Sequence, residues 1–208
     1  MPPSLASVIA DLPLIAILRG IAPDEVLGIG EALVDAGFLC LEVPLNSPEP
    51  FDSIGRLQTH LGDRALIGAG TVLTPQDVAR VGDAGGRLII SPNADPDVIT
   101  ATKAAGLTSL PAFATPTEAF AALKAGADGL KLFPAEAASP KVLQALRAVL
   151  PKSTPVFVVG GVAPDSLKTW RAAGATGFGL GSALYRPGFT AAEVGARAKA
   201  FVQAWREV

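Results

Sequence analysis

The sequence predicts an α/β protein built as one (β/α)8 barrel of the TIM type, and three observations support this prediction. Short apolar runs of strand length alternate with helical patterns, proline stands near the helix starts, and glycine follows the helix ends. The units recur about every 20 to 24 residues, which suits eight repeats in a barrel of compact size. We expect a single domain over residues 1–208.

Eight predicted strands are short and apolar, as parallel strands buried on both faces should be. They cover 14–19, 39–45, 66–72, 88–91, 109–114, 129–133, 156–160 and 177–181. Residues 1–13 precede the first strand and are predicted to contain a helix that covers the barrel bottom.

The predicted helices between these strands have regular boundaries. Proline lies at or next to the first position of seven of them, at Pro23, Pro48, Pro75, Pro96, Pro116, Pro140 and Pro164. Five are preceded by an N-cap residue, namely Ser47, Thr74, Asp95, Thr115 and Ser139, and Thr115 forms a capping box with Glu118. Glycine ends five, at Gly37, Gly85, Gly106, Gly126 and Gly174.

An open doubly wound sheet is the alternative fold. It is disfavoured because no Gly-x-Gly-x-x-Gly pattern follows the first strand, where Arg19-Gly20-Ile21-Ala22-Pro23 stands instead.

Composition narrows the function. The net charge is −2, and no run of Lys and Arg is long enough to indicate nucleic-acid or membrane binding, so we expect a small-molecule partner. The N-terminus lacks a signal-peptide pattern, which predicts a cytoplasmic protein. Cys40 and His60 are the only residues of their types, so we expect no disulfide, no metal and no cofactor. His60 is predicted to lie on the surface and Cys40 to fill the barrel interior.

Lys131 and Glu42 are charges inside two apolar strands. Strand alternation places Leu130 and Leu132 on one face and Lys131 on the other, and Glu42 likewise opposes its neighbours. Both should therefore point into the barrel. Burial favours a neutral amine, which is a nucleophile toward carbonyl carbon. The alternative is a buried ion pair that fixes strand register.

Two further residues end strands at the mouth where barrel enzymes bind substrate, Arg19 after the first and Thr71 after the third. Arg19 could instead cap carbonyl groups at the rim, and Thr71 could reflect only β-propensity. Glycine turns close strands seven and eight, at Gly160 and Gly161 and at Gly181 with Ser182. Their N–H groups predict a phosphate site, although tight turns alone would also need glycine.

These segments, in this order, resemble a known family from about Leu14 to Tyr185. The runs Glu42-Val43-Pro44-Leu45, Gly68-Ala69-Gly70-Thr71-Val72, Lys131-Leu132-Phe133-Pro134-Ala135-Glu136 and Val159-Gly160-Gly161-Val162 are similar to those of the 2-keto-3-deoxy-6-phosphogluconate and -galactonate aldolases, class I enzymes. The resemblance implies a Schiff base on Lys131, acid/base catalysis by Glu42, and carboxylate binding by Thr71. It also implies a phosphate cradle at the glycine turns, a homotrimer, and no metal.

Two positions favour the galactonate branch. Asn46 stands where the gluconate branch has an arginine, so carboxylate binding should depend on Arg19, and Val159 replaces the threonine before the glycine turn. We therefore predict reversible cleavage of 2-dehydro-3-deoxy-6-phosphogalactonate to pyruvate and D-glyceraldehyde 3-phosphate, with Arg19, Asn46, Thr71, Pro134 and Val159 binding substrate. The alternatives are a phosphogluconate or 4-hydroxy-2-oxoglutarate aldolase, and a barrel that binds a phosphorylated sugar acid without catalysis.

Overall fold

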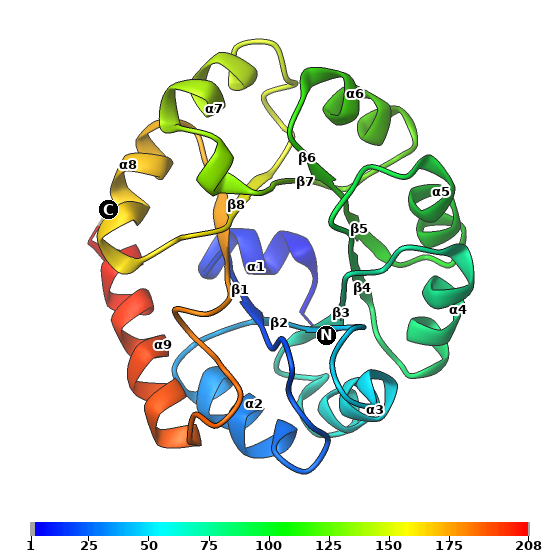
Figure 1. The fold of residues 1–208 in the computed structure, drawn as a ribbon, viewed down its shortest axis with the longest axis vertical. Coiled ribbons are helices and arrows are strands. Elements are labelled where there is room, and N and C mark those ends of the chain that lie inside the picture. Colours follow the sequence, from blue (N-terminus) through cyan, green and yellow to red (C-terminus); the bar gives the residue numbers. More distant parts are fainter. Residues whose placement is uncertain (1–2, 208) are drawn as a thin grey trace.

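A ring of parallel strands surrounded by helices forms the protein (Figure 1). The computed structural model describes residues 3–207, so Met1, Pro2 and Val208 of the predicted domain lie outside the described residues. The strands are β1 Leu14–Ile17, β2 Cys40–Pro44, β3 Leu66–Gly70, β4 Leu88–Ile90, β5 Thr108–Leu110, β6 Ala112–Phe113, β7 Leu130–Leu132, β8 Val156–Val159 and β9 Gly177–Leu180. The (β/α)8 barrel is confirmed, with strands shorter than predicted.

The fifth predicted strand is divided into β5 and β6 by Pro111. β5 pairs with β4, whereas β6 pairs with β7, so the two halves face different neighbours. Pro111 has no N–H to continue a ladder, but its carbonyl oxygen accepts a hydrogen bond from the Lys131 N–H at 2.9 Å. The chain itself closes the barrel at this point, because β5 and β6 form the two ends of the strand order.

Helices cover the outside of the sheet (Figure 1). They are α2 Val26–Asp35, α3 Pro50–Leu61, α4 Pro75–Asp83, α5 Pro96–Ala104, α6 Pro116–Lys124, α7 Pro140–Arg147, α8 Leu167–Ala172 and α9 Ala191–Arg206, with 3-10 turns η1 Ala135–Ala137 and η2 Pro164–Ser166. Thr74, Asp95, Thr115 and Ser139 are confirmed as N-caps, and Thr115 forms the predicted box with Glu118. The five helix-ending glycines all have positive φ, as predicted.

The predicted start of α3 is wrong. α3 begins at Pro50 rather than Pro48, and Glu49 precedes it with a left-handed φ of 38°. Ser47 is not its N-cap, because a turn in which the Ser47 N–H bonds Pro44 O directs the Ser47 hydroxyl toward Gly20 instead. The proline rule also fails for α2, which begins at Val26, three residues after Pro23.

Two apolar layers form the core. The outer layer lies between strands and helices and contains Leu130, Leu132 and Phe178. The inner layer fills the barrel and includes Ile15, Cys40, Leu66, Leu88 and Phe157. The helix α1 Leu5–Asp11 crosses the barrel end in Figure 1, and its Leu5 and Val8 pack into the inner layer. One end of the barrel is thereby filled with hydrocarbon.

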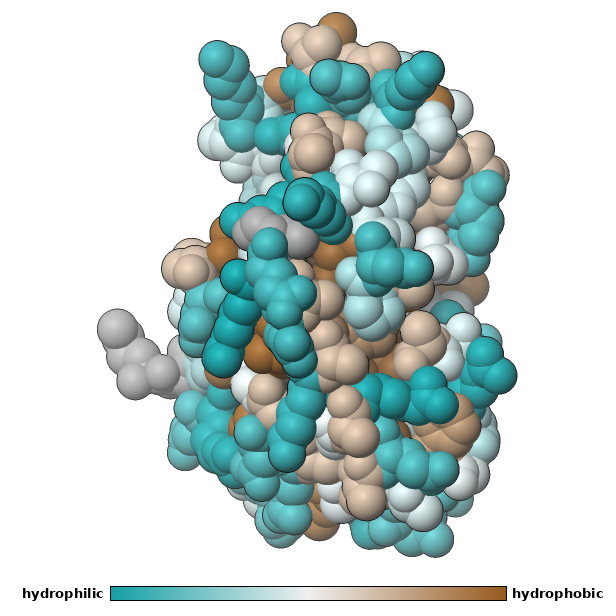
Figure 2. All heavy atoms as spheres, turned by 90° about the vertical axis from the view of Figure 1, so that its left-hand side faces the viewer, coloured by the Kyte–Doolittle hydropathy of each residue, from teal (hydrophilic) through white to brown (hydrophobic). Residues whose placement is uncertain are grey.

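The surface over α8 and α9 is mainly polar (Figure 2). Figure 2 shows the side that α8 and α9 cover, where hydrophilic side chains project and apolar spots are small and separate. Within 3–207, the exposed large apolar side chains are Leu73, Phe120, Val142 and Val149. In the same range, no helix has both the length and the hydropathy that crossing a bilayer requires.

Candidate active site

Lys131 and Glu42 face each other across the barrel. Lys131 lies on β7 and Glu42 on β2, and the two strands are four positions apart in either direction around the ring when β5 and β6 are counted as one strand. Only 7% of Lys131 and 2% of Glu42 is exposed. The chain neighbours Leu130, Leu132 and Leu41 belong to the outer layer, so the inward direction predicted from strand alternation is confirmed.

The two charges do not form a contact ion pair. No nitrogen-to-oxygen distance of 4.0 Å or less joins them in the described part of the chain. The Glu42 Oε2 atom is buried without a hydrogen-bond partner among those residues. The Lys131 Nζ atom lies 4.6 Å from the centre of the Phe133 ring. A buried structural pair needs close contact and satisfied oxygens, and this pair has neither.

Desolvation dominates the electrostatics of both groups. Burial raises the pKa of Glu42 to about 7, although the charges of Lys131 and Arg19 act in the opposite direction. Burial also lowers the pKa of Lys131; the Glu42 carboxylate opposes this change and Arg19 adds to it. The site therefore shifts both groups toward their neutral forms, which for Lys131 is the nucleophilic amine.

The end of β3 makes room for the Glu42 carboxylate. A Cβ at Gly70 would overlap the carboxylate oxygens, so a side chain there would displace Glu42. The next residue, Thr71, has a φ of 57°, a left-handed conformation that a β-branched residue rarely adopts. Backbone strain of this kind is concentrated at functional sites. The φ angle of Thr71 is therefore stronger evidence for a role in the site than the fact that it is a threonine.

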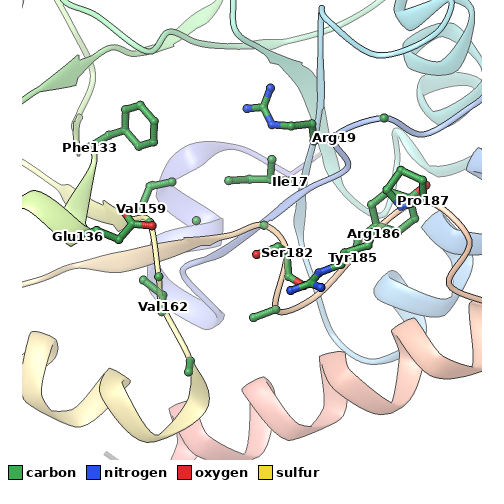
Figure 3. Close-up of a pocket in the computed structure, with 17 residues that line it drawn as sticks. Ile17, Arg19, Phe133, Glu136, Val159, Val162, Ser182, Tyr185, Arg186 and Pro187 are labelled. Carbon is green, nitrogen blue, oxygen red and sulfur yellow. The ribbon is translucent and has the colours of Figure 1, made fainter.

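A cavity of about 670 Å³ opens at the carboxyl ends of the strands (Figure 3). Its walls include Arg19, Val159 and both predicted glycine turns, at Gly160 and Gly161 and at Gly181 with Ser182. Glu42 and Lys131 line a small recess that shares Ile17, Val159 and Gly179 with this cavity. The buried pair thus lies directly below the cavity floor.

Three predicted substrate residues do not line the cavity. Thr71, Asn46 and Pro134 lie outside its wall. Asn46 instead accepts a hydrogen bond from Arg19 Nη1 through its Oδ1 atom, at 2.7 Å. Asn46 thus contacts Arg19, which lines the cavity, and does not line the cavity itself.

Arg186 and Glu136 line the cavity, and sequence reasoning did not single them out. Figure 3 shows Glu136 beside Val159, with Arg186 beyond Ser182 on the other side. The Arg186 Nε–H donates to Ser182 O at 3.0 Å, which holds the guanidinium beside the second glycine turn. The sequence does contain one indication of this role, because Arg186 stands four residues after Ser182 of the predicted phosphate turn.

The described residues do not provide a set of side chains suited to binding a metal ion. No group of three or more His, Cys, Asp or Glu side chains suited to a metal occurs between residues 3 and 207. Cys40 is buried in the inner layer, where burial raises the pKa of its thiol, and His60 is exposed at the end of α3, as predicted.

Comparison with known proteins agrees with a barrel enzyme that acts on carbonyl compounds. The family model for KDPG and KHG aldolases matches residues 5–200. A 2-dehydro-3-deoxy-6-phosphogalactonate aldolase of Escherichia coli (strain K12) is 51% identical over 94% of this chain and 96% of that protein. A probable enzyme of the same name from Rhizobium meliloti (strain 1021) is 48% identical over 94% and 92%.

A solved structure described as native KDPGal superposes with a TM-score of 0.93, at 51% identity, over 94% of this chain and 95% of that one. The fold and the site thus define an aldolase barrel. The chain belongs to the KDPG and KHG aldolase family.

The raised pKa of Glu42 predicts a cost in stability. The carboxyl of Glu42 has an ordinary pKa of 4.5 in the unfolded chain and a pKa of about 7 in the folded protein, so between these pH values only the folded protein keeps the proton. The free energy of unfolding should therefore fall as pH rises from 4.5 to about 7. Glu42→Gln removes the charge, so at pH 8 it should be more stable than wild type by roughly 1 to 3 kcal/mol. Urea unfolding at pH 5 and pH 8 measures this difference.

The matched control is Glu31→Gln, which changes an exposed carboxylate on α2. It should alter stability little at either pH. A Glu42→Gln variant less stable than wild type at pH 8 would mean that the carboxylate contributes favourable contacts that outweigh its desolvation.

Proposed function

We propose that this protein is a class I aldolase that reversibly cleaves 2-dehydro-3-deoxy-6-phosphogalactonate to pyruvate and D-glyceraldehyde 3-phosphate. The observation that carries the proposal is a buried lysine with a lowered pKa, facing a buried carboxylate beneath an open cavity. The names of the two relatives above support the substrate.

The proposed reaction begins when neutral Lys131 attacks the C2 carbonyl carbon. Loss of water gives an iminium ion, which accepts the electron pair of the breaking bond. Glu42, acting through water, takes the proton of the C4 hydroxyl group as the C3–C4 bond breaks. Glyceraldehyde 3-phosphate is released, the enamine is protonated at C3, and hydrolysis of the iminium returns pyruvate and the free amine.

The charges around the cavity suit a substrate that is anionic at both ends. Arg19 lies on the wall of the cavity above the recess that holds Lys131 and Glu42, and we assign it to the carboxylate next to C2. The two glycine turns and Arg186 lie at the other part of the wall, where we assign the phosphate. The volume of about 670 Å³ lies within the usual range for small-molecule sites.

We also propose that the protein is a homotrimer. Phe120 on α6 and Val142 on α7 are 45% and 43% exposed, and the adjacent Val149 is 60% exposed. Val142 and Val149 line one groove with Ala145 and Leu146. Exposed apolar side chains gathered in this way are typical of an interface.

Light scattering tests the homotrimer directly. Wild type should have three times the 21.1 kDa mass of one chain, and the double variant Val142→Asp, Val149→Asp should dissociate because it would bury charge. A monomeric wild type would contradict the proposal, whereas a trimeric double variant would move the interface to another face.

Lys131→Met tests the nucleophile. Methionine keeps similar length without the amine, so turnover should fall below about one per cent of wild type while the fold is retained. Borohydride with pyruvate should add a pyruvate-sized mass to wild type and none to the variant. The control, Lys141→Met, removes an exposed lysine of α7 and should be trapped normally.

Absence of trapping in wild type would favour a barrel that binds the sugar acid without catalysis. Trapping that persists in Lys131→Met would assign the nucleophile to another lysine.

Val159→Thr tests the substrate epimer. Val159 lines both the cavity and the recess, and its methyl groups cannot hydrogen-bond a C4 hydroxyl. We expect wild type to prefer the phosphogalactonate derivative by roughly 10- to 200-fold, the usual size of such shape discrimination. The variant should shift kcat/KM toward the phosphogluconate derivative. A wild type that prefers the gluconate epimer, or an unchanged ratio, would overturn the substrate assignment and leave the aldolase mechanism intact.

A further inference from the structure

Two loops are joined at the rim of the cavity around Arg19. Consecutive residues in the loop after β1, Arg19 and Gly20, bond consecutive residues in the loop after β2, Asn46 and Ser47. Arg19 Nη1 donates to Asn46 Oδ1 at 2.7 Å, and the Gly20 N–H donates to Ser47 Oγ at 2.9 Å. We call these four residues the Arg19 clamp.

Ser47 is the buried member of the clamp. It is 8% exposed, whereas Arg19 and Asn46 are exposed. Its own N–H donates to Pro44 O at 2.9 Å, which fixes Ser47 to the end of the strand that carries Glu42. A buried hydroxyl needs a partner, and here the partner is the backbone next to Arg19.

Gly20 is also held from a third side. Its φ is +83°, and a Cβ at this position would lie only 2.8 Å from the Pro187 Cγ atom. Pro187 belongs to the segment between β9 and α9, which also carries Ser182. Three loops therefore meet at Gly20, of which those after β1 and β9 border the cavity, and Ser47 of the third supplies the hydrogen bond that holds Gly20.

The clamp matters because Arg19 is exposed and flexible by nature. An arginine side chain has many rotamers, and ordering them on binding costs free energy. A group that binds substrate must be held to within about half an ångström to be effective. Asn46 fixes the guanidinium, and Ser47 fixes the backbone one residue further along.

We propose that Ser47 is a positioning residue of the active site, which through the Gly20 N–H holds Arg19 in place for the substrate carboxylate. This inference rests on the proposed function, in which Arg19 binds that carboxylate. It accounts for a buried serine that looked like a helix cap in the sequence.

A purely structural role for Ser47 would leave the electrostatics of the site unchanged. The groups that act on Glu42 are Lys131 and Arg19, and Glu42 in turn acts on Cys40. The charge of Arg19 lowers the pKa of both Glu42 and Lys131. Loosening Arg19 should therefore raise both pKa values and move the acid limb of the pH profile to higher pH.

Ser47→Ala is the test, with Ser53→Ala as matched control. Ser53 is a fully buried serine of α3 whose Oγ has no hydrogen-bond partner among residues 3–207, so its loss removes a hydroxyl without loosening Arg19. Ser47→Ala should lower kcat/KM about 3- to 10-fold, mainly through KM, as expected for one lost hydrogen bond that affects ground-state binding. Its acid limb should shift upward, and Ser47→Thr, which keeps the hydroxyl, should restore both.

Wild-type turnover is measured first, because its absence would overturn the proposed function and this inference together. Normal wild-type turnover with an unchanged KM and acid limb in Ser47→Ala would overturn the inference alone. So would a loss that Ser53→Ala shares, or one that Ser47→Thr fails to restore while remaining folded by circular dichroism.

Discussion

Desolvation of two ionisable groups is the constraint on which the rest of this structure depends. Water would stabilise the charged forms of Lys131 and Glu42, and the barrel interior withholds it from both. Direct contact between them would restore the charges and remove the reactive amine. The barrel avoids that contact by setting the two groups on opposite strands.

Much of the surrounding sequence accommodates this arrangement. The missing side chain of Gly70 leaves space for the carboxylate, and the inner apolar layer below keeps water from reaching the pair from the closed end of the barrel. Above, the cavity wall is made from loops and glycine turns, whose backbone can approach a ligand closely. Rigid strands thus hold the reacting groups, and loops hold the groups that we assign to substrate recognition.

The fold could be predicted because its signals are local and repeated. Strand alternation was sufficient to orient Lys131 and Glu42, and the caps of four helices follow from single side chains. Ser47 could not be interpreted this way, because a serine before a proline matches a helix cap whether or not a distant N–H competes for its hydroxyl. Arg186 was missed for a different reason: its contact with Ser182 is only four residues away, but such a spacing predicts a contact only where the segment turns back on itself, as the one after β9 does. Local patterns therefore predict elements, and contacts between loops require the structure.

The helix α1, which closes one end of the barrel, affects the order in which substrates and products can enter and leave. Because its apolar side chains fill one end of the barrel, molecules bound above the Lys131 recess exchange through the opposite mouth. In the proposed reaction the three-carbon fragment attached to the amine lies deepest, and the phosphorylated aldehyde lies between it and solvent. The aldehyde must then depart first, and in the synthetic direction the keto acid must enter first. The covalent bond to Lys131 and the depth of the recess thus impose the same order, and steady-state patterns should be those of an ordered mechanism.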